Sequence, residues 1–302
     1  MRLETTGLLV APLTPFKPDL SVNYEQIELY MDFLKRNGVS GAFINGTTGE
    51  GLSLSIDERK RVVNHWIDAV PENFKLIVHV GSTSLKESQD LVKHAEEWNA
   101  DAVGTLPPIF FKPTSIPNLV SYLEKIAQNT SLPLYYYHIP SLTGVEFPML
   151  DLLQAVEHIP NFAGIKYTFE TLSDYRLCVR HQGGKYDMLF GRDEILLPAL
   201  TAGAKGFIGS TYNVIPKLYL DVIHAFEQSE LRKAQELQDL AIEFIQILLE
   251  TGSFFSALKT VISSAGIDCG SVRDPLVPLS EPKQKELLAT LKNHPISEYL
   301  AR

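Results

Sequence analysis

The sequence is poor in features that would place it in several common protein classes. It has two cysteines, Cys178 and Cys269, which are far apart and fit no metal-binding or redox spacing. They are therefore expected to be buried free thiols in a reducing compartment. No apolar run is long enough to cross a bilayer, and the start, with Glu4 in it, lacks the apolar core of a signal peptide. These absences predict a soluble cytoplasmic protein.

Positive charge is also scarce. The 27 lysines and arginines are outnumbered by 36 acidic residues, which gives a net charge of -9, and no basic run or basic amphipathic helix occurs. Nucleic acid and membrane surfaces are therefore not expected as partners. The chain contains no G-x-G-x-x-G or Walker sequence. His79 and His138 have no companion at metal-ligand spacing, so we expect structural histidines and no metal.

What the chain does contain is a regular alternation of short β-rich runs and helical patterns. Eight such units in about 230 residues, together with a hydrophobic fraction of 45%, favour a (β/α)8 TIM barrel over a doubly wound sheet. The expected strands cover residues 7–11, 41–45, 76–80, 102–106, 134–137, 162–168, 188–190 and 206–208.

Helical patterns fill the gaps, and one of them begins at a capping box, Ser55-Ile56-Asp57-Glu58. From about residue 230 onward the pattern is helical only, and no linker-like composition precedes it. We therefore predict a barrel domain over residues 1–229 and a C-terminal helical extension over residues 230–302, packed on the barrel as one structural unit.

Lys166 is the most informative residue, because it interrupts an otherwise apolar strand. Alternation along that strand places Phe162, Gly164, Lys166 and Thr168 on one face. A lysine that loses its hydration favours the neutral, nucleophilic amine, and such lysines form Schiff bases with ketones. Taken alone, a lysine at a strand end with its amine in water is the simpler interpretation.

Other polar residues gather where strands end, which is where such barrels carry their catalytic groups. Thr47 and Thr48 lie in the glycine-rich loop 46–51, whose hydroxyls and free N–H groups suit a carboxylate. An ordinary glycine-rich turn is the alternative. Tyr137 ends the fifth strand, with Tyr135 on its face and Tyr136 on the other, and could relay protons to the lysine. Tyr135 and Tyr136 are expected to be core aromatics with satisfied hydroxyls.

Thr168 follows Lys166, and the last two strands add acidic and hydroxyl groups. Asp193 and Glu194 follow the seventh strand, where Asp193 could equally be a helix cap, whereas Glu194 could accept hydrogen bonds from a polyol. Ser210 follows the eighth strand. No arginine or lysine accompanies Ser210, which favours a hydroxyl-rich neutral ligand group over a phosphate.

In this order, the motifs resemble those of the pyruvate-dependent class I aldolases, the family that contains N-acetylneuraminate lyase and dihydrodipicolinate synthase. The resemblance covers essentially the full chain. Its most specific parts are the loop 46–51, Tyr137 followed by Pro140, and Gly164-Ile165-Lys166. The segment 135–145 is similar to that of the branch that cleaves sialic acid, and so is Gly191-Arg192-Asp193-Glu194.

The resemblance implies a Schiff base on Lys166, proton transfer by Tyr137 and a carboxylate held by Thr47 and Thr48. It also implies a sugar bound by Thr168, Gly191, Asp193, Glu194 and Ser210. The substrates would be N-acetylneuraminate, or pyruvate and N-acetylmannosamine, in a homotetramer without a metal or organic cofactor. Phe110-Phe111 stands where many relatives supply a tyrosine from a neighbouring subunit, so a tyrosine relay between subunits is not expected.

Two alternatives remain open. Dihydrodipicolinate synthase uses the same pyruvate enamine, but its branch has an arginine at the position of Leu142, and leucine cannot grip a second carboxylate. A non-catalytic ligand-binding homologue would keep the barrel without turnover. The presence of both Lys166 and Tyr137 argues against that second alternative.

Overall fold

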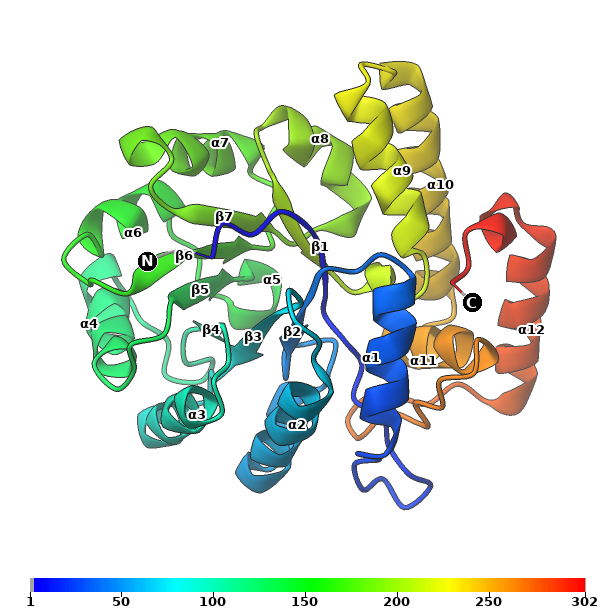
Figure 1. Cartoon of the computed structure of the whole chain (residues 1–302), viewed down its shortest axis with the longest axis horizontal. Helices are drawn as coiled ribbons and strands as arrows, with labels where there is room; N and C mark the ends of the chain where they lie inside the picture. The colour runs from blue at the N-terminus through cyan, green and yellow to red at the C-terminus, as the bar shows by residue number, and fades with distance from the viewer. Residues whose placement is uncertain (1–2, 302) are drawn as a thin grey trace.

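The computed structural model of the chain describes residues 3–301. Met1 and Arg2, part of the start that was expected to carry no signal peptide, lie outside the described residues. Eight parallel strands among residues 3–301 close into a barrel in sequence order, with helices around it (Figure 1), so the predicted TIM barrel is confirmed. The strands are β1 (Gly7–Val10), β2 (Gly41–Ile44), β3 (Lys75–His79), β4 (Ala102–Thr105), β5 (Leu134–His138), β6 (Phe162–Tyr167), β7 (Asp187–Phe190) and β8 (Gly206–Gly209).

Helices connect successive strands and continue after the last strand. Between strands lie α1 (Gln26–Arg36), α2 (Ile56–Ala69), α3 (Leu85–Glu97), α4 (Ile116–Ala127), α5 (Pro140–Thr143), α6 (Met149–Ala155), α7 (Leu172–Arg180) and α8 (Leu196–Thr201). After β8 follow α9 (Pro216–Glu227), α10 (Leu231–Glu250), α11 (Phe254–Ser264) and α12 (Glu281–Asn293). Short 3-10 turns are η1 (Gly51–Ser53), η2 (His181–Gly183), η3 (Asp193–Ile195), η4 (Thr211–Asn213) and η5 (Pro295–Glu298).

Helix α2 forms where its sequence signals indicated. The Ser55 hydroxyl accepts a hydrogen bond from the Glu58 N–H at 3.2 Å, and Glu58 accepts one from the Ser55 N–H at 2.9 Å. Both N–H groups would otherwise lack a partner at the helix start. The helix buries Val62, Val63 and Trp66 on one side. The predicted capping box is therefore confirmed.

Two apolar layers position the site, one inside the barrel and one between strands and helices. Tyr135 and Tyr137 belong to the inner layer with Phe43 and Leu189, whereas Tyr136 belongs to the outer layer. The predicted alternation along β5 is thus confirmed. The Tyr135 hydroxyl donates to Asp187 at 2.8 Å. Both hydroxyls were expected to have hydrogen-bond partners. This was wrong for the Tyr136 hydroxyl, which has no hydrogen-bond partner within residues 3–301.

The alternation predicted for β6 holds near Lys166 but fails at the start of the strand. Leu134 pairs with Phe162 and Tyr135 with Gly164, so Ala163 is an extra residue on β6 and forms a bulge. Phe162 consequently packs in the outer layer and Ala163 in the inner one. The prediction that Phe162 shares the face of Lys166 was wrong, because a bulge shifts the two-residue period by one.

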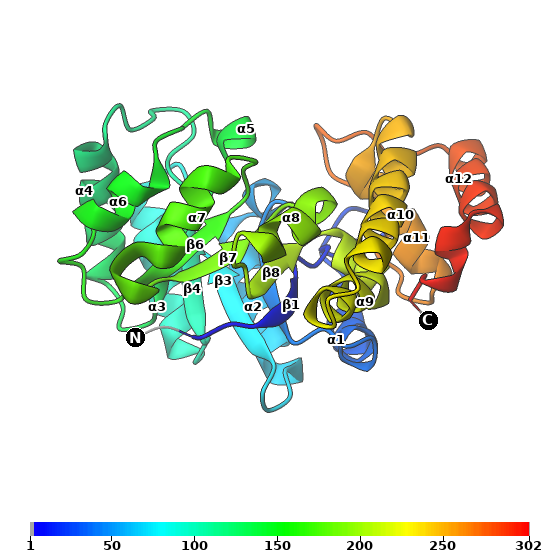
Figure 2. The ribbon, with the colours of Figure 1, turned by 90° about the horizontal axis from the view of Figure 1, so that it is seen from above.

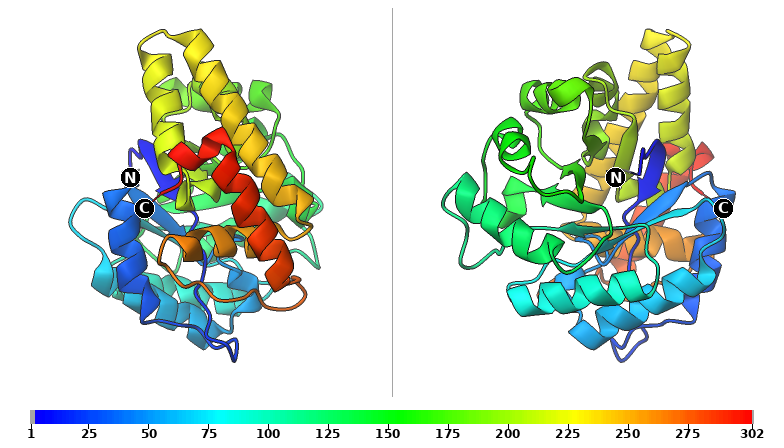
Figure 3. Two further views of the ribbon diagram at one scale, coloured as in Figure 1. Left: turned by 90° about the vertical axis from the view of Figure 1, so that its right-hand side faces the viewer. Right: turned by 60° about the vertical axis from the view of Figure 1, so that its left-hand side comes forward.

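The C-terminal helices lie together at one end of the molecule, beside α9 and α1 (Figure 2). Helix α10 packs along α9, and α12 packs on α11 (Figure 3). Helix α10 also contacts η3, and α11 contacts η4. The domain boundary predicted near residue 230 falls between α9 and α10. These contacts place the extension against the loops after β7 and β8.

The cysteines and the apolar helices are two features that the sequence analysis addressed. Cys178 and Cys269 are buried and free, as predicted. No single helix within residues 3–301 has the length and apolar character needed to span a membrane. Only α10 and α11 taken together reach that criterion, and the pair is bent by 112°.

Candidate active site

Lys166 lies inside the barrel near the carboxyl end of β6, with 4% of its surface exposed. Its Nζ is 4.0 Å from the ring centroid of Tyr137 and 4.2 Å from that of Phe43. Burial lowers the pKa of Lys166 to about 7, and the charge of Asp193 opposes this shift only in part. Because a desolvated ammonium is disfavoured, a large share of Lys166 is the neutral amine at neutral pH.

Tyr137 extends from β5 beside Lys166 and touches the threonine loop. Its hydroxyl is 3.3 Å from Thr47 Oγ1, and its ring packs edge-on against Phe43 and His79. Burial raises the pKa of Tyr137 to about 12, while Thr47 and Thr168 lower that pKa in part. The phenol is therefore protonated at neutral pH and available as a proton donor.

The threonine loop, residues 46–51, is a tight turn after β2. The N–H of Glu50 donates to Thr47 O and the N–H of Gly51 to Gly46 O, both at 3.0 Å. Glu50 has a positive φ of 53°, and a Cβ on Gly51 would lie 1.8 Å from the carbonyl oxygen of Asn45. The glycine at position 51 is thus required by a close backbone approach. Thr48 is buried in this turn, whereas Thr47 is half-buried.

Thr168, just after β6, lies against Gly191, just after β7. Gly191 follows β7, and its N–H donates to Tyr167 O at 2.8 Å. A Cβ on Gly191 would lie 2.1 Å from Thr168 Oγ1, so only glycine leaves room for that hydroxyl. The contact joins the ends of β6 and β7 beside Lys166.

Asp193 is buried, and protein donors bind only one of its two carboxylate oxygens. Oδ2 accepts hydrogen bonds from the N–H and the hydroxyl of Thr211, at 2.9 and 2.7 Å. Oδ1 has no hydrogen-bond partner within residues 3–301. The carboxylate therefore binds the start of η4 and does not cap its own helix, so that alternative interpretation was wrong. Burial raises the pKa of Asp193 to about 6, although the Thr211 hydrogen bonds lower it in part.

Glu194 lies nearer the surface and is held by a neighbour that the sequence did not single out. Its Oε1 accepts hydrogen bonds from Nε and Nη2 of Arg192, at 3.0 and 2.6 Å. Arg192 also contacts Glu170 at 3.3 Å. Ser210 is half-buried at the start of η4, the turn that Asp193 binds. The side chains of Thr48 and Ser210 form no hydrogen bond with the other candidate residues within residues 3–301.

Three residues at the site were missed, and for two of them, Phe43 and Thr211, the signal is not local. Phe43 looked like any strand aromatic, yet its ring touches Lys166 and Tyr137. Thr211 binds Asp193 across 18 positions. Arg192 stood beside Glu194 in the sequence, and a two-residue charge pair at a strand end is the one signal that could have found it.

An apolar cavity of about 350 Å³ opens beside Thr47. Leu106, Ile139, Leu142 and Phe255 line it together with His79. Leu142, expected to discriminate between branches of the family, therefore faces this cavity near the site. Within residues 3–301, no three His, Cys, Asp or Glu side chains gather where they could hold a metal ion.

The whole chain can be compared with known proteins. Residues 4–294 match the model of the dihydrodipicolinate synthetase family. The chain belongs to that family. N-acetylneuraminate lyase A of Xenopus laevis is 41% identical over 89% of this chain and 90% of its own. Members of the family therefore share nearly the full length of this sequence.

Solved structures of the family have the same fold. The N-acetylneuraminate lyase of Proteus mirabilis has a TM-score of 0.92 and 38% identity, and covers 95% of this chain and 97% of its own. A dihydrodipicolinate synthase of Bacillus anthracis reaches a TM-score of 0.91 at 28% identity, with 98% and 100% covered. The fold is common to both branches of the family, so the residues at the site must distinguish between them.

Proposed function

We propose that this chain is a Schiff-base aldolase, a carbon-carbon lyase that reversibly cleaves N-acetylneuraminate into N-acetylmannosamine and pyruvate. The observation that carries the proposal is Lys166, an amine with a pKa near neutrality, buried against a phenol inside the barrel. The curated relatives that are about 40% identical to the chain bear the name N-acetylneuraminate lyase, which favours this substrate over others that the family uses.

In the first half of the reaction, the neutral amine of Lys166 attacks the C2 ketone of the open-chain sugar and forms a carbinolamine. Tyr137 is protonated at neutral pH because burial raises its pKa to about 12. It donates its proton to the departing hydroxyl, water leaves, and an iminium and a phenolate result. The iminium is an electron sink that the bare ketone lacks.

In the second half, the phenolate of Tyr137 takes the proton of the C4 hydroxyl. The C3–C4 bond breaks, its electrons form an enamine, and N-acetylmannosamine leaves as the aldehyde. Tyr137 then returns its proton to C3 of the enamine. Water adds to the resulting iminium and gives a proton to the phenolate of Tyr137, which regenerates the phenol. The carbinolamine then breaks its C–N bond, and pyruvate leaves with Lys166 restored as a neutral amine. The reverse sequence joins the two products.

Two sets of loops would bind the two ends of the substrate. Thr47 and Thr48 lie in the tight turn after β2 and would donate to the carboxylate. From the loops after β6, β7 and β8, the sugar would be positioned by Thr168, Gly191, Asp193, Glu194 and Ser210. Asp193 Oδ1, which has no hydrogen-bond partner within residues 3–301, suits a sugar hydroxyl, since a buried carboxylate oxygen needs a donor.

We further propose the homotetramer and the cytoplasmic location that the sequence suggested. Phe110 and Phe111 are strongly exposed, and large exposed aromatics commonly mark interaction surfaces. Sedimentation of the purified protein would test the first proposal, and cell fractionation the second. A monomer at micromolar concentration, or a membrane-bound protein, would contradict the respective proposal.

The function is tested by incubating the protein with pyruvate and borohydride, then locating the added mass by peptide analysis. We expect the reduced adduct on Lys166, and pyruvate release from N-acetylneuraminate in a parallel assay. Condensation of pyruvate with aspartate semialdehyde in place of N-acetylmannosamine would favour the synthase alternative. A protein that forms no adduct and releases no pyruvate would instead be a non-catalytic homologue.

A further inference from the structure

A second buried lysine joins the C-terminal extension to the threonine loop. Lys259, on α11, is 1% exposed, and its Nζ lies 2.8 Å from Glu50 Oε1. The second oxygen of Glu50 accepts a hydrogen bond from the backbone N–H of Arg273 at 2.8 Å. Lys259 also donates to Ser271 O at 2.6 Å. Both oxygens of the Glu50 carboxylate are therefore held by the extension, more than 200 residues away in the sequence.

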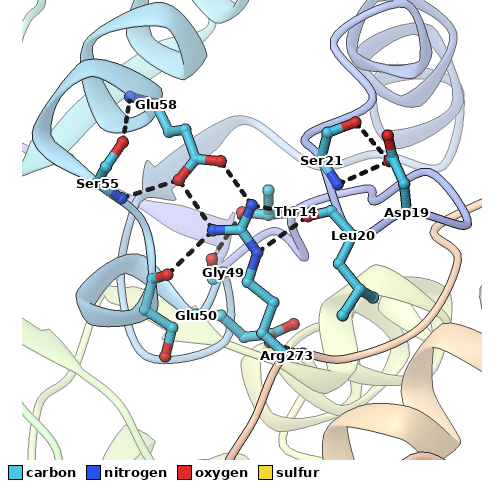
Figure 4. A network of polar contacts seen from close by, with 10 residues as sticks. Thr14, Asp19, Leu20, Ser21, Gly49, Glu50, Ser55, Glu58 and Arg273 are labelled. Atoms are coloured by element: carbon cyan, nitrogen blue, oxygen red, sulfur yellow. Dashed lines mark hydrogen bonds and ion pairs between the residues drawn. The ribbon is translucent and has the colours of Figure 1, made fainter.

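The guanidinium of Arg273 reinforces the same connection from outside (Figure 4). It donates to both oxygens of Glu58 at the start of α2, at 2.5 and 2.8 Å. It also donates to Leu20 O and, at the end of η1, to Ser53 O. Such bidentate pairs are geometrically strict. Arg273 thus connects the extension to three segments around the threonine loop.

The threonine loop itself contributes little to its own conformation. Its own hydrogen bonds are the two turn bonds of Glu50 and Gly51, and Glu50 occupies the left-handed region, which disfavours non-glycine residues. From the barrel, Thr14 Oγ1 donates to Gly49 O at 2.6 Å (Figure 4). A strained turn of this kind persists only when its surroundings hold it. Thr14 and Tyr137 hold it from the barrel, and Lys259 and Arg273 hold it from the extension.

Charge adds a second reason for the pairing. Glu50 follows Thr48 by two residues, close to where the substrate carboxylate would bind. An unpaired buried carboxylate would repel that anion, because charges interact strongly where water is excluded. The ammonium of Lys259 neutralises Glu50. The loop therefore presents its hydroxyl and N–H donors without a net negative charge behind them.

We propose that Glu50 is a positioning residue through which the C-terminal extension, by Lys259 and Arg273, sets the threonine loop for a 2-oxo acid carboxylate. The inference rests on the proposed function. It predicts that loss of this connection weakens the binding of pyruvate far more than the binding of the sugar, whose residues lie after β6, β7 and β8 and not in the loop after β2.

The test compares the wild type with the double variant Glu50→Gln, Lys259→Met. Removal of both charges leaves no unpaired buried ion, which is the main cause of misfolding when one partner is lost. The control is Lys75→Met, Asp101→Asn, which removes an ion pair of 3.1 Å at the start of β3, at the opposite end of the barrel. For each protein, the unfolding midpoint, the pyruvate concentration for half-maximal borohydride trapping and the KM for N-acetylmannosamine are measured.

We expect the double variant to need at least about tenfold more pyruvate for half-maximal trapping, while its KM for N-acetylmannosamine changes less than about twofold. That tenfold change corresponds to the loss of about 1.4 kcal/mol of pyruvate binding. The control should match the wild type in both quantities. A folded double variant with wild-type pyruvate dependence would overturn the proposal, and so would equal losses for pyruvate and sugar.

A second variant decides the question if the double variant does not fold. Arg273→Lys keeps the backbone N–H that binds Glu50 but loses the bidentate contact with Glu58, so it should need about threefold more pyruvate. Unchanged pyruvate dependence in that variant would then overturn the proposal. If the wild type itself traps no pyruvate, the proposed function fails, which is distinct from a failure confined to the variants.

Discussion

The molecule contains two buried lysines that differ in what surrounds them. Lys166 inside the barrel and Lys259 in the extension are 4% and 1% exposed. The Nζ of each lies over a phenylalanine ring, at 4.2 Å from Phe43 and 4.0 Å from Phe16. Lys259 has a carboxylate at 2.8 Å, whereas Lys166 forms no ion pair within residues 3–301.

This difference decides which lysine can be a nucleophile. Burial lowers the pKa of both amines, but the charge and the hydrogen bond of Glu50 act against that shift in Lys259. Lys166 has only the partial opposition of Asp193. Desolvation without a close counter-ion gives a neutral amine, and desolvation with one gives a structural ion pair. Burial alone therefore does not make a lysine reactive.

The largest expected effect comes from removing each lysine in turn. Lys166→Ala should lower kcat by roughly 10⁴-fold or more, since it removes the amine that forms the Schiff base. Lys259→Met, combined with Glu50→Gln so that no buried ion is left unpaired, should still add pyruvate mass at Lys166 when pyruvate is saturating. The loss of kcat is checked by pyruvate release from N-acetylneuraminate, and the adduct is checked by the mass of the Lys166 peptide after borohydride reduction. Appreciable turnover by the Lys166 variant would show that Lys166 is not the nucleophile and would contradict the distinction between the two lysines.

A smaller effect is expected when the phenol beside Lys166 loses its hydroxyl. Tyr137→Phe keeps the ring against the amine but removes the proton relay, so kcat should fall roughly 10²–10⁴-fold. The adduct should still form on Lys166, more slowly. Tyr136→Phe is the matched control, because that side chain faces the outer layer, and its kcat should stay within about twofold of the wild type. Equal losses in both variants would show that packing, and not proton transfer, is responsible.

How much of this site was predictable depends on the range of the interactions. Alternation along β5 and the strand ends identified Tyr137, Lys166 and the threonine loop, because these signals are local and strands of a barrel end at one rim. The bulge at Ala163 was not predictable, since it follows from how β5 and β6 pair.

The connection between Glu50 and Lys259 was equally invisible in the sequence. Each residue alone reads as a surface charge on a loop or a helix, and only the packing of α11 beside the loop brings them together. The same applies to Asp193 and Thr211, which join the loops after β7 and β8. Local periodicity thus predicts which side chains lie at the carboxyl ends of the strands. Tertiary packing determines which charged partners those side chains have.

The pH dependence of adduct formation sharpens the comparison further. Only neutral Lys166 attacks, so the trapping rate should rise with pH through about 7 and level off above it. Asp193, charged above its own pKa of about 6, raises the pKa of Lys166. Asp193→Asn should therefore move the midpoint below 7. At about pH 7 the trapping rate should increase, by at most about twofold, because half of the amine is already neutral there.

The measurement is the initial rate of borohydride trapping with saturating pyruvate between about pH 5.5 and 9. Asp239→Asn, on helix α10 outside the site, serves as the control for a lost carboxylate and should keep the wild-type midpoint. An upward shift of the midpoint in the Asp193 variant would contradict the assigned sign of this interaction.

The smallest expected effect concerns Lys259, where we expect no pyruvate adduct even after its counter-ion is removed. Glu50→Gln removes the counter-ion of Lys259, and the buried amine should then favour its neutral form, as Lys166 does. We nevertheless expect no pyruvate mass on the peptide that contains Lys259. Its Nζ is enclosed by Phe16 and Ser271, and within residues 3–301 no tyrosine ring lies over it as Tyr137 lies over Lys166. Pyruvate mass at Lys259 in this variant would show that a neutral buried amine is sufficient for Schiff-base formation. If Lys166 is labelled and Lys259 is not, Schiff-base formation also requires access for pyruvate and a preformed site for its carboxylate.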